Sequence, residues 1–205
     1  MVTLDAIDVA LAPLCRQDVV QAYSGLGSQF DFVDDSRTVI DFEPLQPDAT
    51  WLVKLFDRSG RCISGADGRP GIRRYLRVRS SLRGQTGLGR VAFNHMMCLE
   101  KEFRRKGLAR EIYRREEALF RKWQAAEVHL NAGCDAVRSQ VWQKLGFELS
   151  MGYRSKVEDL WDEYQRENGI APGRPLERGW FDMDETFRTV TVLPAFSDFH
   201  LFKAL

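Results

Sequence analysis

The spacing of apolar residues predicts several strands along the chain. Residues 90–100 (RVAFNHMMCLE) are a mostly apolar run, which is typical of a central strand. Residues 50–65 (TWLVKLFDRSGRCISG) place two apolar runs on either side of a polar turn, which predicts a strand–turn–strand unit. Apolar or alternating patterns also predict strands at residues 73–82, 126–132, 187–194 and 199–205.

Other segments carry apolar residues at helical spacing. The longest is FRRKGLAREIYRREEALFRK, residues 103–122, in which Gly107 stands near the start. Its buried stripe is predicted to consist of Ala109, Ile112, Tyr113, Phe120 and Trp123. Shorter helices are predicted at residues 18–23 with Asp18 as N-cap, at residues 135–147 with Asp135 as N-cap, and at residues 157–165.

The order of these elements predicts the fold class. Strand, helix, strand and helix follow one another between residues 90 and 147. This order is typical of an α/β fold with a mixed central β-sheet and flanking helices. No segment has the composition of a long linker, so a single domain is predicted for residues 1–205.

Composition narrows the class of protein further. Hydrophobic residues make up 44% of the chain, enough for a sizeable core, and 30 Lys and Arg balance 29 Asp and Glu. No apolar run approaches the roughly 20 residues of a membrane-spanning helix, and the N-terminus lacks the basic start of a secretory signal. The four cysteines are widely spaced, so no metal site is expected. We expect a soluble, cytoplasmic protein.

Charge is nevertheless distributed unevenly along the chain. Seven arginines and no acidic residue occur between Arg69 and Arg90, whereas the segment from Asp31 to Asp48 holds five aspartates, one glutamate and one arginine. Opposite local charges can focus an electric field at a cleft. Two solvated surfaces that partly neutralise each other are an equally good interpretation.

Gly107 is unexpected in a good helix, because glycine is about 1 kcal/mol worse than alanine there. The helix closely follows a predicted strand, and a helix N-terminus offers unpaired N–H groups and partial positive charge to anions. Gly107 and the small Ala109 would let an anion approach the backbone, and Arg104, Arg105 and Lys106 add positive charge. We interpret this segment as a cradle for phosphate or pyrophosphate, with a simple turn glycine as the alternative.

Arg104-x-x-Gly107-x-Ala109 resembles the (Gln/Arg)-x-x-Gly-x-(Gly/Ala) pyrophosphate motif of the GNAT superfamily of acyl-CoA N-acyltransferases. It is neither a P-loop nor a Rossmann fingerprint, because the residues those motifs require are absent. Residues 135–148 (DAVRSQVWQKLGFE) are similar to a later helix of the family, which typically ends in aromatic-x-Lys-Leu-Gly-Phe. The resemblance covers residues 91–150, is looser over residues 1–90, and leaves residues 155–195 as an insertion before the last strand.

The resemblance implies an acyl-CoA-dependent N-acyltransferase, most simply an acetyltransferase that uses acetyl-CoA or another acyl-CoA and no metal. A neutral primary amine would attack the thioester directly, with a base or a relayed water nearby. The Leu99 amide would polarise the thioester carbonyl, which is an oxyanion-hole task. The residues implied to bind the co-substrate are Met97, Cys98, Leu99, Arg104, Arg105, Lys106, Gly107, Leu108, Ala109, Arg110, Asp135, Arg138 and Trp142.

The sequence departs from the family in its later helix. Trp142 stands where many members carry a tyrosine that serves as general acid, and an indole cannot serve as an acid at neutral pH. Asp135 and Arg138 replace the asparagine and alanine that are common earlier in this helix. Tyr153 is a candidate replacement acid, whereas Tyr113 belongs to the apolar stripe and is expected in the core.

Two side chains of the predicted strand are candidate bases. His95 is expected on the same strand face as Phe93, Met97 and Leu99, where a buried structural histidine is the alternative. Glu100 is expected at the strand end beside the thioester, where a solvated turn residue is the alternative.

The sequence does not decide the acceptor, and it leaves two alternative functions open. The acidic segment would favour a cationic acceptor such as a polyamine, an aminoglycoside or a protein lysine, whereas the arginine-rich segment would favour an anionic one such as an aminoacyl-tRNA. No membrane partner is expected, and a homodimer is open. One alternative is a non-catalytic CoA-binding sensor or scaffold. The other is nucleic-acid binding through residues 104–122, whose eight basic and three acidic residues would give salt-sensitive affinity.

Overall fold

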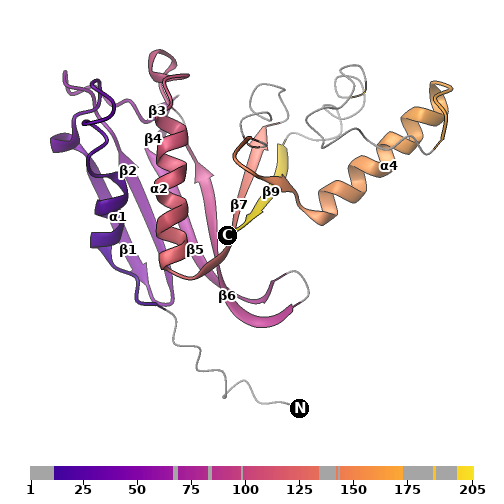
Figure 1. Cartoon of the computed structure of the whole chain (residues 1–205), viewed down its shortest axis with the longest axis horizontal. Coiled ribbons are helices and arrows are strands. Elements are labelled where there is room, and N and C mark those ends of the chain that lie inside the picture. Colours follow the sequence, from indigo (N-terminus) through magenta and orange to yellow (C-terminus); the bar gives the residue numbers. More distant parts are fainter. Residues whose placement is uncertain are drawn as a thin grey trace. The chain divides into compact units, whose positions relative to one another are not determined.

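A computed structural model of the chain describes residues 12–66, 69–82, 85–97, 99–133, 142, 144–172, 187 and 198–205 (Figure 1). The chain divides into two compact units, one formed by Met1–Val128 with Ala204–Leu205 and the other by His129–Lys203. The division falls inside strand β7 (Ala125–Gly133), so this strand contributes residues to both units.

The first unit is built on four strands that are neighbours in the sheet and pair antiparallel, in the order β1-β2-β5-β6. The strand order then continues through β7 and β9 to β8. The four strands are β1 (Val39–Leu45), β2 (Asp48–Lys54), β5 (Ile72–Leu82) and β6 (Gln85–Met96). A separate small sheet pairs β3 (Gly65–Ala66) with β4 (Arg69–Pro70).

Helix α2 (Leu108–Lys122) connects β6 to β7, its neighbour in the sheet. A strand–helix–strand connection between neighbours is the connection that parallel strands require. The predicted α/β class, with a mixed sheet and flanking helices, is therefore confirmed. The strands predicted at residues 73–82, 90–100 and 126–132 are confirmed as well, although β6 ends at Met96.

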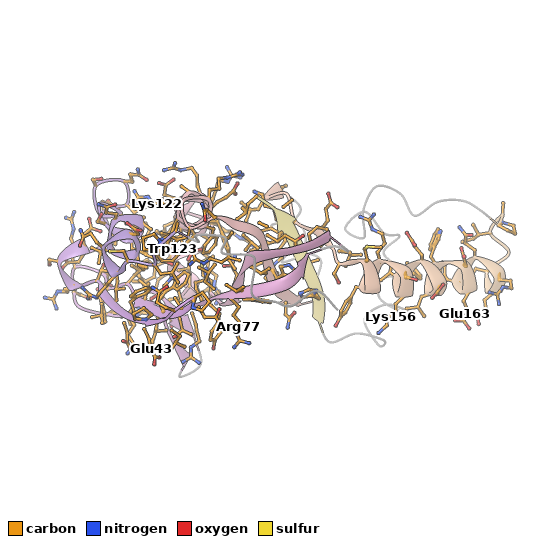
Figure 2. All side chains as sticks on the ribbon, turned by 90° about the horizontal axis from the view of Figure 1, so that it is seen from below. Glu43, Arg77, Lys122, Trp123, Lys156 and Glu163 are labelled. Atoms are coloured by element: carbon orange, nitrogen blue, oxygen red, sulfur yellow. The ribbon has the colours of Figure 1, made fainter. Side chains whose placement is uncertain are left out.

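Helices α1 (Arg16–Tyr23) and α2 cover one face of the first unit's sheet. Side chains on that face, such as Trp51 and Leu76, are almost completely buried, whereas Arg77 on the other face is exposed. Figure 2 shows Glu43 and Arg77 on the side opposite Lys122 and Trp123. The buried face carries the core of this unit.

Large aromatic side chains fill the space between the helices and the sheet. The rings of Trp51 and Trp123 meet edge to face with their centroids 5.6 Å apart, and Phe120 and Phe42 lie beside them at 6.1 and 6.2 Å. Edge-to-face contacts are a favoured geometry for aromatic pairs. The apolar stripe predicted for α2 is confirmed at Ile112, Tyr113, Phe120 and Trp123, and Ala109 is half-buried.

The sequence predicts Asp18 as the N-cap of the first helix, and this prediction is wrong. The helix begins two residues earlier, with Cys15 at the N-cap position. The Asp18 carboxylate instead accepts hydrogen bonds from Lys122 Nζ at 2.8 Å and Trp123 Nε1 at 2.9 Å. Asp18 therefore docks α1 onto the end of α2, through a partner more than a hundred residues away that local sequence patterns do not reveal.

The strand–turn–strand prediction for residues 50–65 is only partly correct. The turn is present, but the second apolar run pairs with the first through an isolated bridge between Phe56 and Cys62 rather than a full strand. The antiparallel neighbours of β2 are β1 and β5. β1 is not among the predicted strands, because its acidic residues and Pro44 resemble an exposed loop. An edge strand tolerates both features.

The two charged segments are less available to ligands than the sequence predicts. Arg74 and Arg90 are buried, at 0% and 1% exposed. Arg90 donates hydrogen bonds to the carbonyls of Ala12 and Trp123. Three of the five aspartates are also committed to local structure, since Asp34 caps a turn of 3₁₀ helix (Asp35–Arg37), Asp35 binds the Gly27 amide and Asp48 binds the Val78 amide.

The second unit contains the remaining described elements. Helix α4 is longer than predicted at residues 157–165 and begins at Met151, so it includes Tyr153. Its Trp161 and Tyr164 pack against Phe187 with centroids 4.9 and 5.1 Å apart. The strand predicted at 199–205 is confirmed as β9, which pairs antiparallel with β8. The elements are β8 (Glu148–Leu149), α4 (Met151–Glu167) and β9 (Asp198–Ala204).

Two predicted elements lie mostly outside the described residues. These are the helix at residues 135–147, of which Trp142 and Lys144 are described as helical, and the strand at residues 187–194. Within the described part of the chain, no helix is both long and apolar enough to cross a membrane.

Candidate functional site

The loop between β6 and α2 has an unusual backbone conformation. A turn of 3₁₀ helix (Lys101–Phe103) follows β6, and the chain then places Arg105 at φ 62° and Gly107 at φ 88°. Positive φ is uncommon for a residue with a side chain, and Arg105 is one of two such residues in the described part of the chain. Residues in left-handed or turn conformations can turn successive N–H groups toward one side, which forms an anion-binding concavity.

Gly107 is the N-cap of α2, so the helix begins at Leu108 rather than at Phe103, where the sequence predicts its start. No side chain caps it in the described structure, and the Gly107 carbonyl accepts from the Glu111 amide at 3.1 Å. The amides of Leu108, Ala109 and Arg110 precede that bond and have no partner within the helix. Together with the helix dipole they make this end of α2 electropositive.

The reason for a glycine at position 107 is its backbone angle rather than space. A Cβ added at Gly107 would meet only the Phe30 ring, at 3.9 Å, which is an ordinary van der Waals distance. A left-handed φ of 88° is what disfavours a side chain here. The expectation that Gly107 keeps an open approach for an anion stays a prediction.

The end of the preceding strand is fixed against a neighbouring segment. Leu99 and Ser64 form an isolated antiparallel bridge, and the Glu100 amide donates to the Ile63 carbonyl at 3.1 Å. This pattern makes Leu99 and Ser64 a non-hydrogen-bonded pair, in which the N–H and C=O of both residues point away from the partner. On that outer side the Leu99 carbonyl accepts a hydrogen bond from Arg104 Nε at 2.6 Å. The Leu99 amide is aimed at the same side.

A β-bulge interrupts β6 at His95. Arg74 lies opposite Asn94, but the next residue of β5, Arg73, lies opposite Met96, so His95 is the extra residue. The expectation that Phe93 and Met97 share one face is wrong, because a bulge inverts the alternation beyond it. Met97 accordingly reaches the helix-covered face, where its sulfur lies 3.8 Å from an Arg74 nitrogen.

Glu100, the second candidate base, lies beside a cation. Its side chain is 34% exposed, and one carboxylate oxygen is 3.8 Å from Arg61 Nη2. Arg61 forms a closer, bidentate pair with Glu102. Glu100 therefore has solvent access and a charged neighbour, and it is not a buried carboxylate.

Aromatic rings surround the positive charge of the loop. Lys106 Nζ lies 5.0 Å above the centre of the Phe32 ring and 5.7 Å from that of Phe103. Phe30 packs against Phe32 with centroids 5.8 Å apart. These cation–π contacts hold Lys106 beside the α2 N-terminus. Phe30 and Phe32 are not among the site residues predicted from the sequence, although two phenylalanines in the polar segment 29–35 are a visible signal.

A buried ion pair lies beneath the same helix. Glu116 is fully buried on α2 and accepts two hydrogen bonds from Arg74, Nε to Oε1 at 2.9 Å and Nη2 to Oε2 at 3.0 Å. The Tyr23 hydroxyl donates to the same carboxylate. Burial raises the pKa of Tyr23 well above its ordinary range, and the Glu116 charge adds to this effect. Burial alone would lower the pKa of Arg74, but the Glu116 carboxylate reverses the effect and raises it.

The other predicted site residues belong to the second unit or lie outside the described structure. Tyr153 is in the first turn of α4, with its ring 6.3 Å from that of His200. Trp142 packs edge to face on Phe147 at 5.6 Å. Cys98, Asp135, Arg138 and the side chain of His95 lie outside the described residues. The structure thus brings together Leu99, Arg104, Arg105, Lys106, Gly107, Leu108, Ala109 and Arg110 in the first unit.

No cluster of three or more metal-ligating side chains occurs among the described residues. The strongest chemical feature of the site is the uncapped N-terminus of α2 beside the positive charge of the preceding loop, which suits a phosphate or pyrophosphate.

The sequence matches no protein-family model and no curated protein. Solved structures with partial likeness include Naa50 of Arabidopsis thaliana in complex with the bisubstrate analogue CoA-Ac-MVNAL, at 11% identity over 76% of this chain and 72% of that one. A bacterial toxin is similar at 15% identity over 76% of this chain and 67% of its own. Both have a TM-score of 0.38, so the conclusions below rest on the geometry and sequence of this chain.

Proposed function

We propose that this protein is an acyl-CoA-dependent N-acyltransferase, most simply one that transfers an acetyl group from acetyl-CoA to a primary amine. The cradle before α2 carries the proposal. Residues Arg104 to Ala109 combine the resemblance to a pyrophosphate motif with two left-handed residues and an uncapped helix N-terminus. These features all suit the same chemical group, the diphosphate of coenzyme A.

The position of Leu99 supports the direction in which the ligand would extend. The Leu99 amide faces away from Ser64, on the side where Arg104 binds the Leu99 carbonyl. A thioester carbonyl held there would receive a backbone N–H as its charge develops during attack. Arg104 would join the thioester end of the site to the diphosphate end.

The proton-transfer groups are the less constrained part of the proposal. Glu100 is the candidate base with described surroundings, and its partial exposure leaves a water within reach of the carboxylate. It would accept the ammonium proton of the acceptor, directly or through that water, before the amine attacks. Tyr153 remains the candidate acid for the departing thiolate, and His95 the second candidate base.

A non-catalytic CoA sensor is the second candidate function. The nearby Arg61 favours it, because the Glu100 carboxylate lies 3.8 Å from a cation, as in an ordinary surface ion pair. The tryptophan at position 142 points the same way. Both functions require acyl-CoA to bind at the cradle, so binding is tested first and acyl transfer second.

Nucleic-acid binding by the basic helix has less support. Arg114 and Arg115 both bind Glu111, Arg121 binds Glu117, and Lys122 binds Asp18. These pairs neutralise the outer length of α2 from within the chain. The remaining positive charge of residues 104–122 is concentrated near the helix N-terminus, where a single small anion fits better than a phosphate backbone.

The charged segments leave the acceptor class open. Arg74 and Arg90 are buried, and several aspartates of the acidic segment have structural partners, so neither group of residues marks the class of acceptor. The acceptor is therefore proposed only as a primary amine, carried by a small molecule, a protein or an aminoacyl-tRNA.

Calorimetric titration of acetyl-CoA into the wild type and Gly107→Glu tests the cradle. A carboxylate placed among the amides should weaken binding by at least about a hundredfold, because like charges in contact cost several kcal/mol. Gly169→Glu is the matched control, because Gly169 also has a positive φ, 65°, and open space around it. Its affinity for acetyl-CoA should equal that of the wild type.

Absence of acetyl-CoA binding by the wild type would refute both the transferase and the sensor. Binding that is lost in Gly107→Glu alone would establish the cradle. A screen of amines for release of free coenzyme A thiol would then separate the two, since a sensor releases none.

A further inference from the structure

The guanidinium of Arg74 connects two elements that the proposed ligand must bridge. From β5 it donates two hydrogen bonds to Glu116 on α2, and a third to the carbonyl of Arg73 at 3.0 Å. Its Nη2 also lies 3.8 Å from the sulfur of Met97, just beyond the end of β6. One buried side chain thus contacts the helix that carries the cradle and the segment that leads to Leu99.

The Arg74–Glu116 pair has no solvent access, since both residues are 0% exposed. Its neighbours across the strands are Trp51 and Asn94, and both polar atoms of the Asn94 amide have no hydrogen-bond partner among the described residues. Tyr23 on α1 shares the carboxylate. The pair therefore lies in a polar patch within an otherwise apolar core.

A patch of this kind is a poor means of stabilising a fold. Taking two charges out of water costs about as much as their attraction returns, and replacing a buried ion pair by apolar residues of similar volume is often neutral or stabilising. A bidentate Arg–carboxylate pair does fix distance and direction, because its two parallel hydrogen bonds tolerate little rotation. The pair is better suited to positioning than to stability.

We propose that Arg74 and Glu116 are positioning residues that hold the α2 cradle at a fixed distance from the Met97–Leu99 segment, so that both ends of one acyl-CoA molecule can bind at once. The inference rests on the proposed function. It goes beyond it by assigning a role in ligand binding to two buried residues that do not touch the ligand.

The test compares two ligands and one apolar variant. Acetyl-CoA contains both the diphosphate and the pantetheine arm, whereas ADP carries the diphosphate on adenosine and lacks the pantetheine arm. The variant Tyr23→Phe/Arg74→Met/Glu116→Leu removes the ion pair without leaving a buried charge. It should be at least as stable as the wild type to urea, bind acetyl-CoA roughly ten- to a hundredfold more weakly, and bind ADP unchanged.

Ile112→Val is the matched control, since Ile112 is buried on the same helix. It should lose some stability and keep the wild-type ratio of acetyl-CoA to ADP affinity. Arg74→Lys keeps the positive charge but cannot make the two parallel hydrogen bonds to Glu116. It should therefore lower the ratio of acetyl-CoA to ADP affinity as the apolar variant does. If the apolar variant does not fold, Arg74→Lys decides by this ratio.

Each outcome is decisive. Equal affinity changes for both ligands, or none for either, would overturn the positioning role while leaving the proposed function intact. A wild type that binds neither ligand would overturn the proposed function and this inference with it. A selective loss of acetyl-CoA affinity in a folded variant would establish the role.

Discussion

Arg104 Nε donates a hydrogen bond of 2.6 Å to the main-chain oxygen of Leu99. This bond crosses from the loop before α2 to the segment after β6, between residues only five apart in sequence. It also directs Nε of the exposed Arg104 side chain toward the Leu99 backbone. Arg104, the first residue of the motif, therefore links the loop to the segment after β6, and its charge is held beside the Leu99 backbone.

Arg104→Ala should consequently weaken acetyl-CoA binding more than another loss of positive charge nearby. A hydrogen bond to a charged group contributes about 1.5–3 kcal/mol, so roughly a tenfold or larger rise in Kd is expected. Arg110→Ala is the control, because Arg110 is exposed in the first turn of α2 and its substitution removes the same charge. Calorimetric titrations that give the same Kd for both variants would reduce Arg104 to a general electrostatic role.

Gly107→Ala should destabilise the protein although the methyl group has room. The left-handed φ of 88° costs a residue with a Cβ about 1–2 kcal/mol. Gly152→Ala, within helix α4 and with no atom within 4 Å of its added Cβ, should instead be neutral or stabilising by up to about 1 kcal/mol. Urea unfolding curves measure both changes, and a stable Gly107→Ala protein would show that the loop can relax.

The segment from β6 to α2 is the part that sequence predicts well. Its apolar run and its apolar helix stripe are local patterns, and β6 and the buried Ile112 follow from them, whereas α2 begins five residues later than predicted, after Gly107. The bulge at His95 could not be predicted, because it depends on how β6 pairs with β5. The strand face assigned to Met97 was wrong for that reason.

Buried charged residues are the other feature that local sequence patterns do not reveal. Arg74 has the neighbours of a solvated arginine in the sequence, and its partner Glu116 is 42 residues away. A signal did exist in α2, since Glu116 falls at helical spacing from Ile112 and Phe120 and an acid in an apolar stripe requires a partner. Which arginine supplies that partner is decided by tertiary packing.

Asp18→Ser distinguishes the docking role of Asp18 from a capping role. Serine is as good an N-cap as aspartate, so a cap would tolerate the change. In the observed geometry serine is too short to reach Lys122 and Trp123, and the indole N–H loses its acceptor, which should cost about 1–3 kcal/mol. Gln17→Ser, at the exposed neighbouring position, is the control in the same urea unfolding assay. Equal stability of the two variants would restore the capping interpretation.

Stability should also fall in acid through Glu111. Hydrogen bonds from Arg114, together with those from Arg115, hold the pKa of Glu111 at about 2, below its ordinary 4.5. A carboxylate whose pKa is lower in the folded state stabilises the protein above the unfolded value, and this contribution is lost as pH falls from about 4.5 toward 2.

Glu111→Gln removes that contribution, so the stability difference between wild type and variant should be greatest near neutral pH and should shrink across this interval. Solvent screening limits the difference to about 1 kcal/mol. Thermal or urea unfolding at a series of pH values measures it, with Glu163→Gln, on an exposed face of α4 (Figure 2), as the control. A difference that stays constant from pH 7 to pH 2 would show that the two arginines do not stabilise the Glu111 carboxylate in the folded protein.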